Sequence, residues 1–171
     1  MNRTEIIIKT LQLNPHPEGG YFRETYRSEG MISGEELGER YTGKRNFSTG
    51  IYFLLTSESF SAFHRIVQDE AWHFYDGSPL FLHMISPRGE YTRVTIGRNF
   101  EKGEVPQFVV PGGTWFAAGV AGEDSFSLLG CTVAPGFDFA DFEMGRRKDL
   151  TTLFPHLKEI IFNFSREFLG I

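Results

Sequence analysis

Residues 60–77, FSAFHRIVQDEAWHFYDG, carry the clearest pattern in the chain. Apolar and polar side chains alternate along them, which indicates β-strands with one buried face. The turn-prone pair Gln68-Asp69 separates two short strands, with His64 on the first and Glu70 at the start of the second. Aromatic residues surround these polar groups, a composition typical of a buried pocket that holds little water. The alternative, an exposed hairpin with solvated charges, fits the regular alternation less well.

His64 is the first candidate for chemistry in this pocket. It shares a strand face with Ala62 and Ile66, and an apolar face of that kind points inward. Glu70 opens the next strand and could reach it. A carboxylate partner fixes the tautomer of a histidine and raises its basicity, as a general base requires. His73 falls on the opposite face of its strand from Glu70. A histidine that is simply hydrogen-bonded in the core is the alternative interpretation.

Short strands follow one another between residues 48 and 133 at hairpin spacing, without an intervening helix. Eight or nine such strands predict a sandwich or a barrel. The sequence also predicts a short helix over residues 4–13, a strand over 21–28 and one long loop over 29–46. The last segment, residues 156–171, fits a helix or a strand equally well.

The composition describes a single domain, residues 1–171, that is rich in aromatic side chains. A net charge of −5 argues against binding to a nucleic-acid backbone or an anionic membrane. Cys131 is the one cysteine, so we expect no internal disulfide and a cytoplasmic location. No apolar run reaches the ~18 residues of a membrane span, and Arg3 and Glu5 interrupt any signal-peptide pattern.

Two further polar clusters stand apart from this pattern. In HPEGGYFRE, residues 16–24, charged groups flank a Gly pair that lets the backbone approach another element closely. A pocket rim, a dimer interface or an ordinary turn with a surface ion pair would each fit that cluster. In GFDFADFE, residues 136–143, three carboxylates lie among three Phe residues. Those carboxylates are either exposed or paired with a cation, for which Arg23, Arg27 and Arg65 are candidates.

The spacing of Glu70 and Gly77 resembles the end of the first motif of the cupin superfamily, and Pro111 and Gly113 match the second motif. The second-motif histidine is Phe116 here, and the histidine pair of the first motif is not in place. The chain is more similar to one branch of the superfamily, the cupin_5 family of unknown function. That similarity rests on HPEGGYFRETYRS (16–28), FSTGIYFLL (47–55), FHRIVQDEAWHFYDG (63–77), VPGGTWFAA (110–118) and VAPGFDFADFE (133–143).

The resemblance implies an all-β double-stranded β-helix, the cupin jelly-roll, with short flanking helices. It suggests a metal-independent epimerase or isomerase acting on a sugar nucleotide, by analogy with dTDP-4-dehydrorhamnose 3,5-epimerase, a related jelly-roll. In that interpretation His64 is the catalytic base, Glu70 orients it, and either Tyr52 or Tyr75 donates a proton. The expected ligand-binding residues are Glu18, Tyr21, Arg23, Trp72, Phe74, Phe116, Asp141 and Glu143.

Two other functions stay open: a non-catalytic protein that binds a small ligand, and a degraded metallocupin. A metal site would use His64 and Glu70, and its third ligand would have to come from His16 or His83. We therefore expect no tightly held metal and no other cofactor. A homodimer is expected, because the strand over residues 21–28 has two mixed polar faces suited to pairing with a partner's sheet. Many cupins resemble this arrangement.

Overall fold

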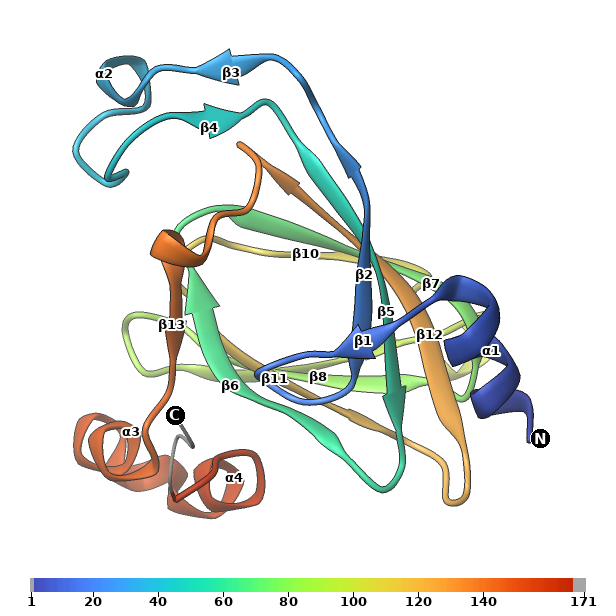
Figure 1. Ribbon diagram of the computed structural model, residues 1–171. Coiled ribbons are helices and arrows are strands. Elements are labelled where there is room, and N and C mark those ends of the chain that lie inside the picture. The colour runs from blue at the N-terminus through green and yellow to red at the C-terminus, as the bar shows by residue number, and fades with distance from the viewer. Residues whose placement is uncertain (1, 168–171) are drawn as a thin grey trace.

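Two antiparallel β-sheets face each other in the computed structural model, which describes residues 2–167 (Figure 1). The first sheet has the strand order β1-β2-β5-β12-β7-β10, and the second has the order β13-β6-β11-β8-β9. The strands of the first sheet are β1 (Asn14–Pro15), β2 (Tyr21–Arg27), β5 (Thr49–Thr56), β7 (Asp69–Gly77), β10 (Gln107–Val110) and β12 (Phe126–Ala134). Those of the second sheet are β6 (Phe60–Ile66), β8 (Leu80–Ile85), β9 (Tyr91–Ile96), β11 (Trp115–Val120) and β13 (Phe142–Met144). The predicted all-β sandwich is confirmed.

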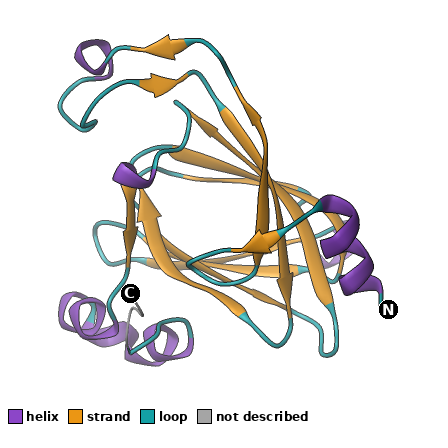
Figure 2. Cartoon of the chain, in the orientation of Figure 1, coloured by secondary structure: helices purple, strands orange, loops and turns teal. Residues whose placement is uncertain are grey.

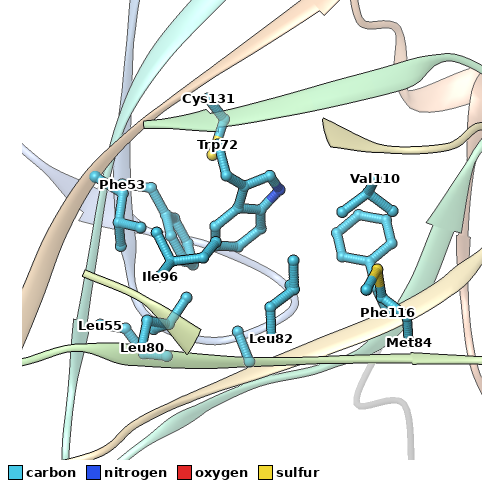
Figure 3. Close-up of a cluster of buried hydrophobic side chains, with 12 residues drawn as sticks. Phe53, Leu55, Trp72, Leu80, Leu82, Met84, Ile96, Val110, Phe116 and Cys131 are labelled. Atoms are coloured by element: carbon cyan, nitrogen blue, oxygen red, sulfur yellow. The ribbon is translucent and has the colours of Figure 1, made fainter. Parts of the chain in front are cut away.

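The main core fills the space between the two sheets (Figure 3). Trp72 of the first sheet meets Phe53 at a ring-centroid distance of 5.7 Å and Phe116 of the second sheet at 6.1 Å. Because side chains alternate across a strand, every second residue contributes to this layer. Each large side chain buried here stabilises the fold by about 1.5–3 kcal/mol. Phe53, Trp72 and Cys131 belong both to this core and to the wall of a cavity.

Helices cover the outer faces of both sheets. On the first sheet lies α1 (Arg3–Leu11), whose Ile8 and Leu11 pack against Leu54. On the second sheet lie α3 (Arg147–Leu153), η3 (Pro155–Leu157) and α4 (Lys158–Asn163), and Ile161 packs against Trp115. The segment that fitted a helix or a strand is thus helical over 158–163, and its residues 168–171 lie outside the described part. Within residues 2–167, no helix has the length and apolar character needed to cross a membrane.

Residues 29–46, predicted as one long loop, contain a short two-stranded sheet and a helical turn. Here β3 (Met31–Ile32) pairs with β4 (Arg45–Asn46), and α2 (Gly34–Leu37) lies between them. Ser33 and Glu36 form a capping box that starts this turn. That signal is present in the sequence, but it is short beside the polar, glycine-rich composition around it. The segment projects beyond the two main sheets (Figure 2).

The link between β6 and β7 passes from one sheet to the other. β6 pairs with β11 and β13, whereas β7 pairs with β12 and β10. The bend lies at Val67-Gln68, one residue before the predicted pair Gln68-Asp69, because Asp69 already begins β7, and the two strands form no hairpin. His64 and Glu70 therefore enter the interior from different sheets. Two 3-10 turns, η1 (Phe100–Lys102) and η2 (Phe139–Asp141), precede β10 and β13.

Candidate functional site

A cavity of about 290 Å³ lies between the sheets. Its wall is mainly apolar, and the exposed residues Asp138 and Phe139 are part of its rim. The ionisable residues that line it are His16, Glu18, Glu24, Arg27, His64, Glu70, Cys131 and Asp138. Of the other predicted ligand residues, Trp72 lines the cavity, while Phe74 and Phe116 pack in the adjoining core.

Glu18 and His64 form a buried pair in this cavity. His64 Nε2 lies 2.9 Å from Glu18 Oε2, and His64 Nδ1 lies 2.7 Å from the carbonyl oxygen of Ala62. A carbonyl only accepts, so Nδ1 carries a proton and donates it to Ala62. The hydroxyl of Ser61 donates to Glu18 Oε1 at 2.8 Å. Both ring nitrogens and both carboxylate oxygens of the pair therefore have partners.

Burial and mutual charge act against each other in this pair. Burial opposes a charged imidazole, but the charge of Glu18 and the hydrogen bond to it raise the pKa of His64 above its ordinary value. Burial alone would raise the pKa of Glu18, yet the charges of His64 and His16 and the hydrogen bonds from His64 and Ser61 lower it. Both directions favour the imidazolium–carboxylate form of the pair.

Two glycines allow the loop that carries Glu18 to lie against β6. Gly19 and Gly20 have φ angles of +118° and +74°, a region that favours glycine. A Cβ on Gly19 would lie 2.1 Å from the carbonyl oxygen of Phe60. The Ala62 N–H donates to the carbonyl oxygen of Glu18 at 2.9 Å. The close backbone approach that the Gly pair predicts is confirmed.

Glu70 has a different environment from Glu18. Burial raises the pKa of Glu70 to about 7, and the nearby charge of His64 opposes that rise. Its side chain hydrogen-bonds the thiol of Cys131, and burial raises the pKa of that thiol well above its ordinary value. A carboxyl group with such a pKa is close to half ionised at neutral pH, so Glu70 can both take up and release a proton there.

His16 lies beside the Glu18–His64 pair and contacts Glu18. Its Nδ1 lies 3.3 Å from the backbone nitrogen of Glu18 and 3.5 Å from Glu18 Oε2, and both contacts are long. Burial lowers the pKa of His16, and the charge of Glu18 opposes this only in part. His16 is therefore neutral at neutral pH. Its ring meets that of Phe22 edge-on, with centroids 4.6 Å apart.

The predicted partnership of His64 and Glu70 has to be revised. Both residues line the cavity, but the carboxylate hydrogen-bonded to His64 belongs to Glu18. Their closeness in sequence suggested Glu70, whereas the change of sheet between β6 and β7 places Glu70 on another wall. Phe116 packs against the imidazole of His64 with a centroid distance of 4.1 Å.

Tyr52 and Tyr75 lie on the outer face of the first sheet and do not line the cavity. Their rings meet edge-on, with centroids 6.3 Å apart. Glu70 and Phe53 line the cavity from the same two strands, and residues of the opposite phase point outward. This orientation removes both tyrosines as proton donors to a ligand in the cavity.

β2 presents other residues to the cavity than those predicted. Phe22 and Glu24 line it, so Tyr21 and Arg23 lie on the outer face. Arg23 Nη1 donates to Gln12 Oε1 at 3.3 Å. The predicted ligand contacts of Tyr21 and Arg23 are therefore replaced by those of their neighbours in sequence.

Asp141 and Glu143 make structural ion pairs away from the cavity lining. Asp141 is buried and accepts from Arg45 Nε at 2.7 Å, from Arg45 Nη2 at 2.6 Å and from Gln68 Nε2 at 2.6 Å. Glu143 is exposed and pairs with Arg65 at 2.6 Å. The predicted candidate Arg65 is confirmed as the partner of Glu143, whereas Asp141 pairs with Arg45, which is not among the predicted candidates.

The residues present do not fit the metal site that the superfamily resemblance would imply. Within residues 2–167, no three His, Cys, Asp or Glu side chains are grouped so as to hold a metal ion. His83, considered as a third ligand, packs outside the barrel, and its Nδ1 lies 2.8 Å from the Tyr91 hydroxyl. Phe116 has no lone pair to offer at the position of the second-motif histidine.

Several cavity residues were missed by reasoning from the sequence alone. They are Phe22, Phe137, Phe139 and Phe142. His16 and Arg27 also line the cavity, although the sequence suggests them only as a possible metal ligand and as a possible partner of a carboxylate. Strand alternation could have found Phe22, because it has the same phase as Glu24 and the opposite phase from Tyr21. No periodic signal marks the others, because they lie in loops or at strand ends whose course depends on tertiary packing.

Comparison with known proteins gives a consistent family. The Cupin_5 profile, described as Cupin superfamily (DUF985), matches residues 5–145. An uncharacterized protein of Saccharomyces cerevisiae is 34% identical over 152 residues, covering 84% of this chain and 75% of the yeast protein. A solved structure of a hypothetical protein from Leishmania major has a TM-score of 0.88 and 41% identity, covering 97% of this chain and 100% of that chain. A protein from Shewanella oneidensis has a TM-score of 0.87 and 40% identity, covering 97% and 99%.

A more distant structural similarity concerns the fold alone. Oxalate decarboxylase from Bacillus subtilis has a TM-score of 0.54 at 15% identity, covering 90% of this chain and 37% of that chain. At so low an identity, shared architecture carries no information about substrate or reaction. Together with the two facing sheets, it confirms the predicted cupin-type jelly-roll with short flanking helices.

Proposed function

The chain belongs to the Cupin_5 family of the cupin superfamily, and we propose that it is a metal-independent epimerase or isomerase. Its reaction is proton transfer on a small molecule held in the barrel cavity. One observation carries the proposal: Glu70 and the Glu18–His64 pair meet a common cavity from different sheets. Two ionisable groups whose environments move their pKa values differently are the arrangement that acid–base catalysis uses.

Glu70 is the proposed base. Its carboxylate takes a proton from the carbon next to a substrate carbonyl, and the C–H electron pair moves into that carbonyl to give an enolate. The imidazolium of His64 stabilises the developing negative charge. His64 Nε2–H then turns from Glu18 and gives its proton to the carbon, which reforms the carbonyl. One proton returns from Glu70 to His64 through solvent and restores the starting state.

These roles differ from those expected from the sequence, where His64 was the base. Both nitrogens of His64 already have hydrogen-bond partners, whereas Glu70 is bonded only to a thiol. The substrate class implied by the resemblance is a sugar nucleotide. A cavity of about 290 Å³ has room for its sugar ring, while the nucleotide would extend past the rim.

A non-catalytic binding protein is the second candidate. The mainly apolar wall, with Phe22, Phe53, Trp72 and Phe142 in it, would hold a small molecule whether or not a reaction follows. The two candidates differ in one observable, the exchange of carbon-bound hydrogen.

The test is hydrogen–deuterium exchange in D2O, followed by proton NMR on a panel of small carbonyl compounds that includes sugar nucleotides. We expect Glu70→Gln to lower the exchange rate about 100-fold or more, since a general acid or base contributes about 10²–10⁴-fold. Glu143→Gln is the matched control, because Glu143 is an exposed carboxylate outside the cavity lining. Its exchange rate should equal that of the unaltered protein.

Three results would count against the proposal. Saturable binding without exchange would favour the binding protein. Exchange that persists in Glu70→Gln would remove Glu70 as the base. Stoichiometric iron, nickel or zinc bound at His64, in protein purified without chelator, would overturn the metal-independent mechanism.

A further inference from the structure

The ionisable lining of the cavity is predominantly acidic. Two cations face four carboxyl groups: Arg27 and His64 against Glu18, Glu24, Glu70 and Asp138. When Glu70 is ionised, the carboxylates therefore exceed the cations by two charges. Low-dielectric walls concentrate such a field, and an acidic cavity attracts cations and repels anions.

Most donors of the two lining cations are already hydrogen-bonded. Arg27 donates from Nε at 2.9 Å and from Nη2 at 2.7 Å to Glu24, and from Nη1 at 2.8 Å to Asn46. Both nitrogens of His64 are hydrogen-bonded to Glu18 and Ala62. An anion that took the Nε2 proton of His64 would leave Glu18 as a buried carboxylate without its partner. An anion at Nε and Nη2 of Arg27 would have to displace the carboxylate of Glu24.

Among residues 2–167, Glu70 is the buried carboxyl group of the cavity without an ion-pair partner. Its residue is 8% exposed and lines the cavity, and its only side-chain hydrogen bond within residues 2–167 is with the thiol of Cys131. A carboxylate can accept several strong hydrogen bonds, and a thiol is a weak donor. Glu70 therefore has unused acceptor positions in a site from which bulk water is largely removed.

The rest of the wall suits an organic cation with an apolar body. Phe22, Phe53, Trp72 and Phe142 line the cavity, and aromatic faces attract ammonium groups. The volume, about 290 Å³, equals the space of about ten water molecules at about 30 Å³ each. A compact molecule with one ring fits that space.

We propose that the cavity binds a small organic cation, a protonated amine on an apolar or aromatic body, with its ammonium group paired to Glu70. This inference concerns the same cavity but goes beyond the proposed function, because it assigns Glu70 to the charge of a ligand. It replaces the sugar nucleotide with a cationic molecule.

The pairing makes binding depend on pH in a definite direction. An ammonium group pairs with the ionised form of Glu70, whose pKa is about 7 in the free protein. The ionised fraction rises from about one-tenth at pH 6 to about nine-tenths at pH 8, so affinity should rise about tenfold over that interval. The groups that face Glu70 are His64, Glu18 and Cys131. Of these, His64 and Glu18 stay paired, and the thiol stays protonated.

The experiment is isothermal titration of the full chain with three probes of similar shape: benzylamine, benzyl alcohol and benzoate. We expect saturable binding of benzylamine, at least tenfold tighter than that of benzyl alcohol, and no measurable binding of benzoate. Benzylamine keeps its charge between pH 6 and 8, so its affinity should rise about tenfold over that range. Glu70→Gln should lose both the preference for the amine and the pH dependence, while Glu143→Gln keeps both.

Several outcomes would overturn this inference. The first is that benzoate or a sugar nucleotide binds more tightly than benzylamine. The second is that benzylamine does not bind at pH 8, and the third is that Glu70→Gln binds benzylamine as tightly as the unaltered protein does. The probe comparison on the unaltered protein decides the matter even where that variant fails to fold. Amine binding without hydrogen exchange on any carbonyl compound would remove the catalytic proposal and leave this one. Hydrogen exchange on neutral or anionic compounds, without binding of any amine, would remove this inference and leave the catalytic proposal.

Discussion

Glu70 weakens the fold as it ionises, because its carboxylate is buried without a cation paired to it. Its pKa is about 7 in the folded chain, against an ordinary value of 4.5. Below pH 4.5 the group is protonated in both states and has no effect. Between pH 4.5 and 7 the unfolded chain gives up the proton more readily, so stability falls by about 3 kcal/mol, at about 1.36 kcal/mol per pH unit. Above pH 7 the loss stays constant.

Glu70→Gln should therefore make the protein more stable at pH 8 and leave its stability nearly unchanged at pH 4. We expect the free energy of unfolding of the unaltered chain, relative to the variant, to drop by about 3 kcal/mol between these pH values. Urea unfolding at both pH values measures the difference. Glu143→Gln is the control, since Glu143 is exposed and should not change the pH profile in this way. Parallel profiles for Glu70→Gln and the unaltered chain would contradict the raised pKa.

Strand alternation explains which site residues could be predicted from the sequence. It places His64 and Glu70 inside because each lies in a regular strand. Tyr52 and Tyr75 have the chemistry of a proton donor, but the phase of their strands points both side chains outward. Glu18 lies in a loop, so its contact with His64 depends on tertiary packing that no local pattern encodes.

At the scale of elements, the Gly19-Gly20 loop is the part of the structure that sets the position of Glu18. Gly19→Ala would place a Cβ 2.1 Å from the carbonyl oxygen of Phe60, at a φ of +118°. We expect a loss of about 3 kcal/mol or more, from overpacking together with backbone strain. Gly103→Ala is the matched control, because φ there is +75° and nothing lies within 4 Å of the added atom. It should cost about 1–2 kcal/mol.

Two measurements separate these variants. Urea unfolding gives the stability difference, and NMR titration gives the pKa of His64. That pKa should fall in Gly19→Ala, because Glu18 moves away, and should stay unchanged in Gly103→Ala. Equal stability losses in the two variants would show that the close approach to Phe60 does not matter.

The buried pair of Arg45 and Asp141 joins β4 to η2. Asp141→Asn leaves the guanidinium of Arg45 buried without a counter-charge, and we expect a loss of about 3–5 kcal/mol. Replacing both, as Arg45→Met with Asp141→Leu, should recover most of that loss. Glu143→Gln, which breaks the exposed pair with Arg65, should cost about 1 kcal/mol or less. Urea unfolding of the four proteins forms the comparison, and a similar cost for Asp141→Asn and Glu143→Gln would refute it.

Strand spacing predicts most elements of the sandwich, because a short segment of alternating apolar and polar residues can be recognised as a strand from its own sequence. Which strands pair with one another is harder to predict from the sequence. Nothing in residues 60–77 shows that β6 and β7 belong to different sheets, since either arrangement buries the same alternating face. Hydrogen bonding to β11 and β12, far along the chain, decides it.

At the scale of the whole molecule, β2 leaves part of a sheet edge open. β1 pairs with it only at Tyr21 and Phe22, and no described strand covers its outer side over residues 23–27. We expect a twofold dimer through this edge, with an interface of more than ~1,200 Å². Light scattering at micromolar concentration should give twice the chain mass of 19.5 kDa.

A substitution can test this edge directly. Tyr26 is 57% exposed on β2, and Tyr26→Glu should shift the protein towards a monomer by adding charge to the interface. Phe100→Glu is the control, since Phe100 is 69% exposed on η1 and outside that edge. A mass of about 20 kDa for the unaltered protein, that of a monomer, would contradict the predicted dimer.

Cys131 gives the interior a chemical reporter of its own. It is the one thiol of the chain, it is buried, and it lines the cavity next to Glu70. A small uncharged alkylating reagent has to enter the barrel to reach it, and the raised pKa of the thiol keeps that reaction slow. Any molecule resident in the barrel would block the reagent. The mass of the intact protein during labelling would then reveal what fraction of molecules is vacant, whatever the chemical identity of the occupant.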